Sequence, residues 1–195
     1  EDDDKPPTLN QSQDEIHLEQ ILKSMLAADS QKRLTAEDEF KKISPDEKAT
    51  LLLRVSKHSE AAEELRSLSL DLLSRLLNDI LHTWCSDNLV PFGEQLIQSI
   101  LTETSDKIRA KLGDILVQVA AHSLVLNSGV FAYPWIADFI RDCVNDKSSS
   151  LKRIALSLIR RVPNVFGSKG QADLRDCIQK GLKDADSSVR FCALE

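Results

Sequence analysis

The sequence is poor in the residues that make tight turns. Among 195 residues there are only 6 glycines and 6 prolines, while 42% of the residues are hydrophobic. This shortage argues against many β-strands and favours long helices joined by short loops. No apolar run approaches the roughly 18 to 20 uncharged residues that a membrane span needs, and no charged-then-apolar signal peptide is present. We therefore expect a soluble, intracellular helical protein that makes no use of a membrane.

An excess of positive charge is also missing, because the net charge is −6. The acidic residues gather in positions 1–64, where sixteen Asp and Glu face nine Lys and Arg. Nucleic-acid binding depends on a basic face that neutralises phosphates, so we expect no nucleic-acid partner. Partners of this acidic part are expected to be basic proteins.

The chain lacks the usual motifs of enzymes and metal sites. Its four cysteines are widely separated without a C-x-x-C pair, and none has a histidine at ligand spacing: Cys85, Cys143, Cys177 and Cys192. Zinc needs four clustered nitrogen or sulfur ligands. A glycine-rich phosphate loop, a nucleophile elbow and a His–Glu metal motif are all absent from the sequence. We predict free thiols in a reducing compartment, no cofactor, no metal and no catalysis.

The chain does contain a short sequence motif that recurs, and we call it the signature. Asp106 opens the segment Asp-Lys-Ile-Arg, Asp146 precedes Leu151 and Lys152, and Asp186 opens Asp-Ser-Ser-Val-Arg. The aspartates lie 40 residues apart, and each precedes an amphipathic helix. A period of roughly 40 to 47 residues with two helices per unit is typical of stacked HEAT or armadillo repeats. We interpret each aspartate as a helix N-cap and the basic residue after it as a contact to the adjoining repeat.

Hydrophobic spacing predicts the individual helices. The first four are expected at about 14–27, 30–43, 45–58 and 60–79, with Ser30 and Ser44 as caps and Leu34 on a buried stripe. Three more pairs follow, and the last ends with the sequence soon after its second helix begins. The predicted fold is all-α: a right-handed α-solenoid of HEAT repeats with about five antiparallel helix pairs, the last incomplete.

Two regions follow from this pattern. Residues 1–13 read as a disordered acidic lead-in, in which Asp2-Asp3-Asp4-Lys5 resembles part of a protease-cleavage linker. Residues 14–195 read as a HEAT-repeat solenoid that is truncated at its C-terminus, where Leu194-Glu195 could be a cloning scar.

Several segments, taken in their order and spacing, carry a resemblance to a known family. They are 33–37 (RLTAE), 61–66 (AAEELR) leading into 72–77 (LLSRLL), Trp84, 102–105 (TETS), 133–135 (YPW) and 163–167 (PNVFG). The pattern resembles the N-terminal HEAT repeats of importin-β-type nuclear transport receptors, the karyopherin-β family. It is most similar to the branch that imports ribosomal proteins and histones. Tyr133 and Ser74-Arg75 depart from that family's usual residues.

The resemblance implies a shuttling receptor that carries basic protein cargo between cytoplasm and nucleus, contacts nucleoporins, and binds the GTPase Ran in its GTP form. It is expected to act as a monomer. In that family the second helices of the early repeats line the concave face and contact Ran. The polar strips of those helices are therefore the candidate Ran-binding residues: Lys32, Arg33 and Glu37; Glu64, Ser67, Asp71 and Ser74; Lys107, Lys111, Asp114 and Gln118.

Two other interpretations compete. Each of these strips could simply be the solvated face that every soluble solenoid has. A HEAT-repeat scaffold of another system, such as a phosphatase regulatory subunit, would show the same repeat pattern, because a solenoid does not dictate its ligand.

Overall fold

The computed structural model describes residues 12–126, 134–167 and 170–194, and in these ranges the chain is helical with no β-strand. The chain divides into two compact units, Glu1–Leu73 and Ser74–Glu195. The helices are α1 (Gln13–Met25), α2 (Ser30–Lys42), α3 (Pro45–Ser56), α4 (Glu63–Ile80), the 3-10 turn η1 (Leu81–Thr83), α5 (Ser86–Thr102), α6 (Asp106–Leu126), α7 (Pro134–Asn145), α8 (Ser149–Arg161), α9 (Gln171–Leu182) and α10 (Ser187–Leu194).

In the first unit α1 packs against both α2 and α3. In the core of this unit Leu18 and Leu22 of α1 and Leu52 and Leu53 of α3 are fully buried. A buried carboxylate lies among them, since Glu15 of α1 accepts a hydrogen bond from Nη1 of Arg54 in α3 at 2.9 Å. By contrast, α2 buries only Ala36.

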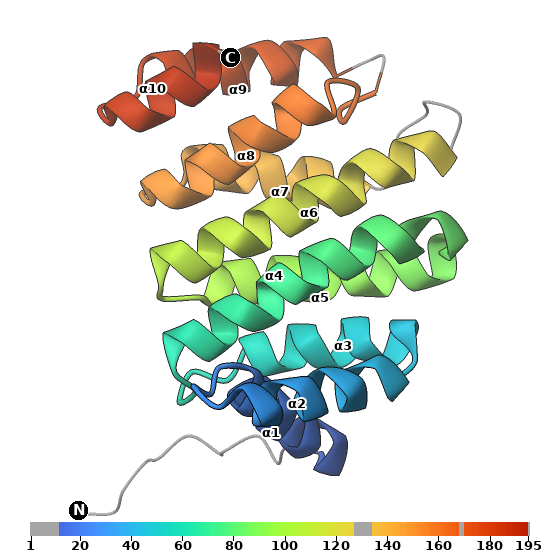
Figure 1. Ribbon diagram of the computed structural model, residues 1–195. Helices are drawn as coiled ribbons and strands as arrows, with labels where there is room; N and C mark the ends of the chain where they lie inside the picture. The colour runs from blue at the N-terminus through green and yellow to red at the C-terminus, as the bar shows by residue number, and fades with distance from the viewer. Residues whose placement is uncertain (1–11, 127–133, 168–169, 195) are drawn as a thin grey trace, which may run out of the picture. The chain divides into compact units, whose positions relative to one another are not determined.

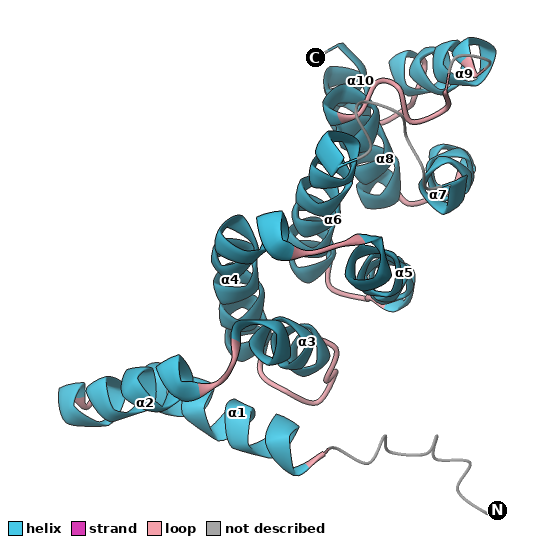
Figure 2. Cartoon of the chain, turned by 90° about the vertical axis from the view of Figure 1, so that its right-hand side faces the viewer, coloured by secondary structure: helices cyan, strands magenta, loops and turns pink. Residues whose placement is uncertain are grey.

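In the second unit the helices form two rows. Figure 2 shows α6, α8 and α10 in one row and α5, α7 and α9 in the other, and Figure 1 shows their pairs in successive layers. Within each pair the helices contact each other, and α6 contacts α8, which contacts α10. A continuous core shared between neighbouring repeats is what defines a solenoid. The predicted all-α architecture of paired helices is therefore confirmed for the described residues, which form ten α-helices.

Three helical glycines let these repeats approach closely. A Cβ at Gly93 of α5 would lie 2.3 Å from the Trp135 ring of α7, and one at Gly113 of α6 would lie 2.6 Å from Cγ1 of Ile154 in α8. Gly181 of α9 meets Ala193 and Leu156 in the same way. Each large side chain fills the space that the missing Cβ leaves, which fixes how one repeat seats on the next.

The recurring aspartates have different roles from one copy to the next. Asp186 is the N-cap of α10, because its carboxylate accepts the Ser188 N–H at 2.8 Å. In the other two copies a serine occupies the cap position: Ser105 before α6 and Ser148 before α8. The prediction that all three aspartates cap is therefore wrong for Asp106 and Asp146. Near the start of the chain, similarly, Asp29 caps α2 and Ser30 is its first helical residue.

The basic residue of the signature is the more regular part. It occupies the fourth position after the N-cap in all five second helices: Arg33, Arg66, Arg109, Lys152 and Arg190. The four arginines donate to carbonyl oxygens of the turn that precedes their own helix or of the helix end before it, whereas Lys152 reaches Asp184 of the next repeat at 2.6 Å. We call this position the turn clamp. Two of these basic residues make the predicted contact to an adjoining repeat: Lys152 pairs with Asp184, and Nη1 of Arg109 donates to Oγ of Ser150.

Some sequence expectations fail at single residues. Leu34, predicted on a buried stripe, is 56% exposed. Helix boundaries differ from prediction by up to three residues, and α1 starts at Gln13, inside the predicted lead-in. The rest of that lead-in lies largely outside the described residues. No described helix has the length and hydrophobicity that crossing a membrane would require.

Candidate binding surface

On α2 the predicted residues have separate roles. Lys32 and Glu37 are exposed. Arg33, however, is the turn clamp of its repeat, and its Nη1 donates to the carbonyls of Ala27 at 2.8 Å and Ala28 at 2.9 Å. Its guanidinium thus already donates hydrogen bonds within the chain, and its role as a partner-binding group stays a prediction.

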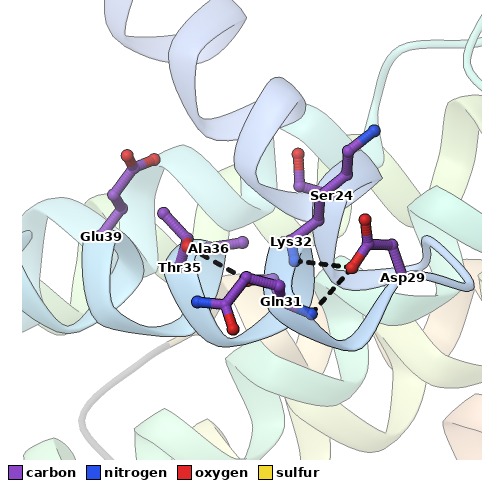
Figure 3. A pocket seen from close by; sticks show the side chains of 7 residues that line it. All are labelled: Ser24, Asp29, Gln31, Lys32, Thr35, Ala36 and Glu39. Atoms are coloured by element: carbon purple, nitrogen blue, oxygen red, sulfur yellow. Dashed lines mark hydrogen bonds between the residues drawn. The ribbon is translucent and has the colours of Figure 1, made fainter.

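A shallow cleft of about 470 Å³ lies beside α2 (Figure 3). Its lining is mostly polar: Ser24, Asp29, Gln31, Lys32, Thr35, Ala36 and Glu39. The Asp29 carboxylate faces the start of the helix, where it accepts the backbone N–H groups of Gln31 and Lys32 at 2.8 and 3.3 Å. The Lys32 side chain is therefore the cationic group that this cleft presents.

The α4 strip is only partly accessible. Glu64 and Asp71 are exposed, but Ser67 is only 9% exposed, because the apolar arc of α4 is wide enough to take in this small side chain. Ser74 is half-buried and its backbone carbonyl accepts a hydrogen bond from Nε2 of Gln118 at 3.2 Å. Ser67 and Ser74 therefore offer a partner less surface than the sequence predicts.

Of the predicted residues on α6, one makes hydrogen bonds to another helix and the others lie at least partly at the surface. Gln118 links α6 to α4, since its Nε2 also donates to Oδ1 of Asn78 at 2.6 Å. Lys107 and Asp114 are exposed and Lys111 is half-buried. Although Asp114 is exposed as a whole residue, partial desolvation of its carboxyl group raises its pKa, and the charges of Arg153 and Lys111 oppose that shift. A further hydrogen-bond donor that reaches this carboxylate would favour its ionised form.

Asp114 lies in a groove of about 260 Å³ that crosses the row of second helices in the second unit. We call it the three-helix groove. Its polar lining comes from Asp106 and Asp114 of α6, from Ser149, Ser150, Arg153 and Ser157 of α8, and from Asp186 and Ser188 at α10. Hydrogen bonds from Ser149 and Ser188 lower the pKa of Asp186 to about 2.

The contributions of α8 and α10 to this groove were missed by sequence reasoning. The signal that could have found them is the register of the repeats. Counted from the N-cap, Ser149 and Ser187 are each the first helical residue, and both follow an aspartate of the signature by one to three positions. Aligning the second helices on the turn clamp would have placed their early polar residues side by side.

Two of the four cysteines are buried and poorly suited to thiolate chemistry. All four are free thiols, and burial, with help from Asp146 and Asp142, raises the pKa of Cys143 to about 12. Burial also raises the pKa of Cys177. Since the thiolate is the reactive form, these two side chains are inert packing groups. In the described residues no group of three or more His, Cys, Asp and Glu side chains is placed to hold a metal ion.

Comparison with known proteins bears on the whole arrangement. Residues 104–195 match the family model described as IPO5-like, TPR repeats. Crystal structures of the karyopherin Kap121p superimpose on nearly the whole chain at 20% identity. With Kap121p bound to Pho4p the TM-score is 0.78, covering 94% of this chain and 18% of that one. With Kap121p bound to Nup53p and to RanGTP the TM-scores are 0.76 and 0.73, each covering 92% of this chain and 17% of Kap121p.

The chain has the karyopherin fold. It spans less than a fifth of the length of Kap121p. TPR and HEAT units are both helix pairs that stack into solenoids, so the family description and the observed karyopherin fold agree on architecture.

Proposed function

We propose that this chain is the N-terminal part of a nuclear import receptor of the karyopherin-β type, which binds Ran in its GTP form and carries protein cargo through the nuclear pore. The observation that carries the proposal is the match of residues 104–195 to IPO5-like repeats within a chain that has the karyopherin fold. Kap121p, with the same fold, is known in complexes with RanGTP, with Nup53p and with Pho4p.

The proposed Ran surface consists of the accessible candidates on the second helices. They are Lys32, Glu37, Glu64, Asp71, Lys107, Lys111 and Asp114. Three of them are lysines and four are carboxylates, which suits a partner of mixed charge. Many modest polar contacts spread over several repeats give reversible binding, as a receptor that must release its partner needs.

Other partners follow from charge. The chain has a net charge of −6, and complementary charge accelerates association. We therefore propose basic proteins, such as ribosomal proteins or histones, as cargo, with nucleoporins as transient contacts during shuttling between cytoplasm and nucleus. Such a receptor acts as a monomer and without catalysis.

The nucleotide dependence of Ran binding tests the proposal. The chain, extended through several further repeats, should retain Ran loaded with GTP in a pull-down and fail to retain Ran loaded with GDP. Binding that ignores the nucleotide, or no binding at all, would contradict the transport function and favour a scaffold of another system.

Charge reversal tests the proposed surface separately. Asp71→Lys and Lys111→Glu should each weaken RanGTP binding by about tenfold, equivalent to about 1.4 kcal/mol, measured by calorimetry. Glu94→Lys is the matched control, because Glu94 is exposed on α5, a first helix. If the control weakens binding as much as the two test variants, the second helices are not the Ran surface.

A further inference from the structure

The helix α8 differs in charge from the rest of the chain. Its sequence, SSLKRIALSLIRR, contains basic residues and no acidic one, whereas the whole chain has 31 Asp and Glu against 25 Lys and Arg. Among the described α-helices, only α8 and the short α10 lack an acidic residue. The net charge of −6 already keeps the protein soluble, so solubility does not account for a local excess of positive charge.

Basic residues of other helices often have a carboxylate one helical turn earlier. In the described residues such ion pairs are Glu19–Lys23, Asp38–Lys41, Asp106–Arg109, Asp138–Arg141 and Asp176–Lys180. In α8 the positions three and four residues earlier are serine or leucine for each of its exposed arginines: Arg153, Arg160 and Arg161. Their own helix therefore does not balance their charge.

The exposed arginines lie along one side of α8. Arg153 and Arg160 are two helical turns apart and share a face, and the half-buried Ser157 lies between them. We call Arg153, Ser157, Arg160 and Arg161 the α8 strip. Seven residues of helix rise about 10 Å, a distance that an extended chain covers with about three residues. One short segment of a partner can therefore reach along the whole strip.

The two ends of the α8 strip have different surroundings. Arg153 lines the three-helix groove, where its charge acts on Asp114 and is partly balanced by it. The helix α6 packs against α8 but has no acidic residue after Asp114, so α6 offers no carboxylate toward the C-terminal end of the strip. The positive charge of the strip is thus concentrated at Arg160 and Arg161.

The helix dipole alone does not explain these two arginines. It favours basic residues in the last turn of a helix. The second helices α4 and α6, however, have no basic residue in their last turns, although they are longer than α8. A basic last turn is therefore not a requirement of the repeat.

The surroundings of the strip decide between two classes of anionic partner. Guanidinium groups bind carboxylates and phosphates in paired hydrogen bonds. Nucleic acid needs several phosphate contacts over a broad basic face. Here the carboxylates of the three-helix groove lie at one end of the strip, and they repel a polyanion that extends beyond it. A short run of Asp and Glu in a protein fits the strip better.

We propose that the α8 strip binds an acidic segment of a protein partner, with carboxylates paired to Arg160 and Arg161 and a further one within reach of Arg153 and the Ser157 hydroxyl. The helix α8 contributes nothing to the proposed Ran surface, and the proposal stands whether or not the chain binds Ran.

Fluorescence anisotropy with a labelled peptide of alternating glutamate and serine tests the proposal. The net charge of the chain repels this peptide as a whole, so binding at about 0.15 M salt has to come from a local basic site. A peptide with glutamine in place of glutamate should bind at least about tenfold more weakly.

Three results would overturn the proposal. They are no binding of the glutamate peptide, equal binding of the glutamine peptide, and tighter binding of a single-stranded RNA than of the glutamate peptide. The last of these would make the strip a nucleic-acid site instead.

Substitutions in the strip locate the site. Arg160→Gln and Arg161→Gln each remove a charge and should each weaken binding of the glutamate peptide by at least about fivefold. Arg161→Lys keeps the charge without the planar fork and should lose less than Arg161→Gln. Arg175→Gln is the matched control, because Arg175 is an exposed arginine on α9, a first helix, and it should leave affinity within about twofold.

The control decides between local and overall charge. Equal losses in Arg161→Gln and Arg175→Gln would show that the peptide responds to the charge of the whole protein, and the proposal would fail. Circular dichroism melts of each variant confirm that it is folded.

Discussion

The two helices α2 and α8 have the same length and the same starting geometry, yet they are packed very differently. Each has 13 residues and a turn clamp at the fourth position after its N-cap. In both, the seventh position after the cap is a buried alanine, Ala36 in α2 and Ala155 in α8. Apart from this alanine α2 has no buried residue, whereas α8 has five more: Leu151, Ile154, Leu156, Leu158 and Ile159.

The comparison shows that the recurring signature determines where a second helix begins, whereas the number of apolar residues it buries determines how much its packing stabilises the fold. Charged or polar residues of α2 stand at four of the five positions where α8 has a buried leucine or isoleucine, and the fifth is the half-buried Phe40, so α2 removes little apolar surface from water. Burial of a large aliphatic side chain contributes roughly 1.5–3 kcal/mol. We therefore expect α2 to open locally at low cost and the α6–α8–α10 row to resist opening.

The largest expected contrast comes from truncating one leucine in each helix. Leu158→Ala deletes a fully buried side chain and should cost about 2–5 kcal/mol of the free energy of unfolding. Leu34→Ala, at an exposed position, should change it by less than about 0.5 kcal/mol. Urea unfolding followed by circular dichroism measures both. Similar losses in the two variants would mean that α2 is packed as tightly as α8.

A smaller effect is expected at the close approach of α6 to α8. Gly113→Ala introduces a Cβ where Ile154 Cγ1 lies 2.6 Å away, so the variant should lose about 1–3 kcal/mol despite its better helix propensity. The double variant with Ile154→Ala should lose less than the sum of the two single variants, because the smaller side chain makes room. Strict additivity would show that these two positions do not meet.

The smallest expected effect is a pH dependence of the unfolding midpoint that arises from Asp186, the N-cap of α10 in the second unit. The pKa of Asp186 is lowered from the ordinary 3.8 to about 2, so its hydrogen bonds stabilise the folded chain above pH 4 and are lost as the pH falls toward 2. Asp186→Asn keeps a good N-cap but cannot titrate, so its unfolding midpoint should fall less over this interval. Parallel curves for the two proteins would refute the role of this carboxylate.

The sequence predicted the helices well because their signals are local. Period and spacing identified all five pairs, and Pro45 marked the start of α3 correctly. Caps were predicted less well, because aspartate and serine are almost equally good caps and a shift of one or two residues decides between them. That is why Asp29 and Ser105 take positions given to Ser30 and Asp106.

The candidate surface was harder to predict because it depends on contacts between repeats. Arg33 and Lys32 are neighbours in sequence with the same charge, yet one is bonded to turn carbonyls and the other is exposed. Ser67 belongs to a polar strip by spacing but is covered in the fold. Periodicity gives the face of a helix, whereas only the packed structure shows how far its neighbours extend over that face.

The turn clamp has a consequence for how such a chain can vary. Successive clamps lie 33, 43, 43 and 38 residues apart, from position 33 through 66, 109 and 152 to 190. In four of the five repeats the loop between paired helices is held by an arginine of the following helix, so the loop does not have to satisfy its carbonyls itself. Insertions and deletions in those loops can therefore accumulate between related chains while the second helices keep their phase.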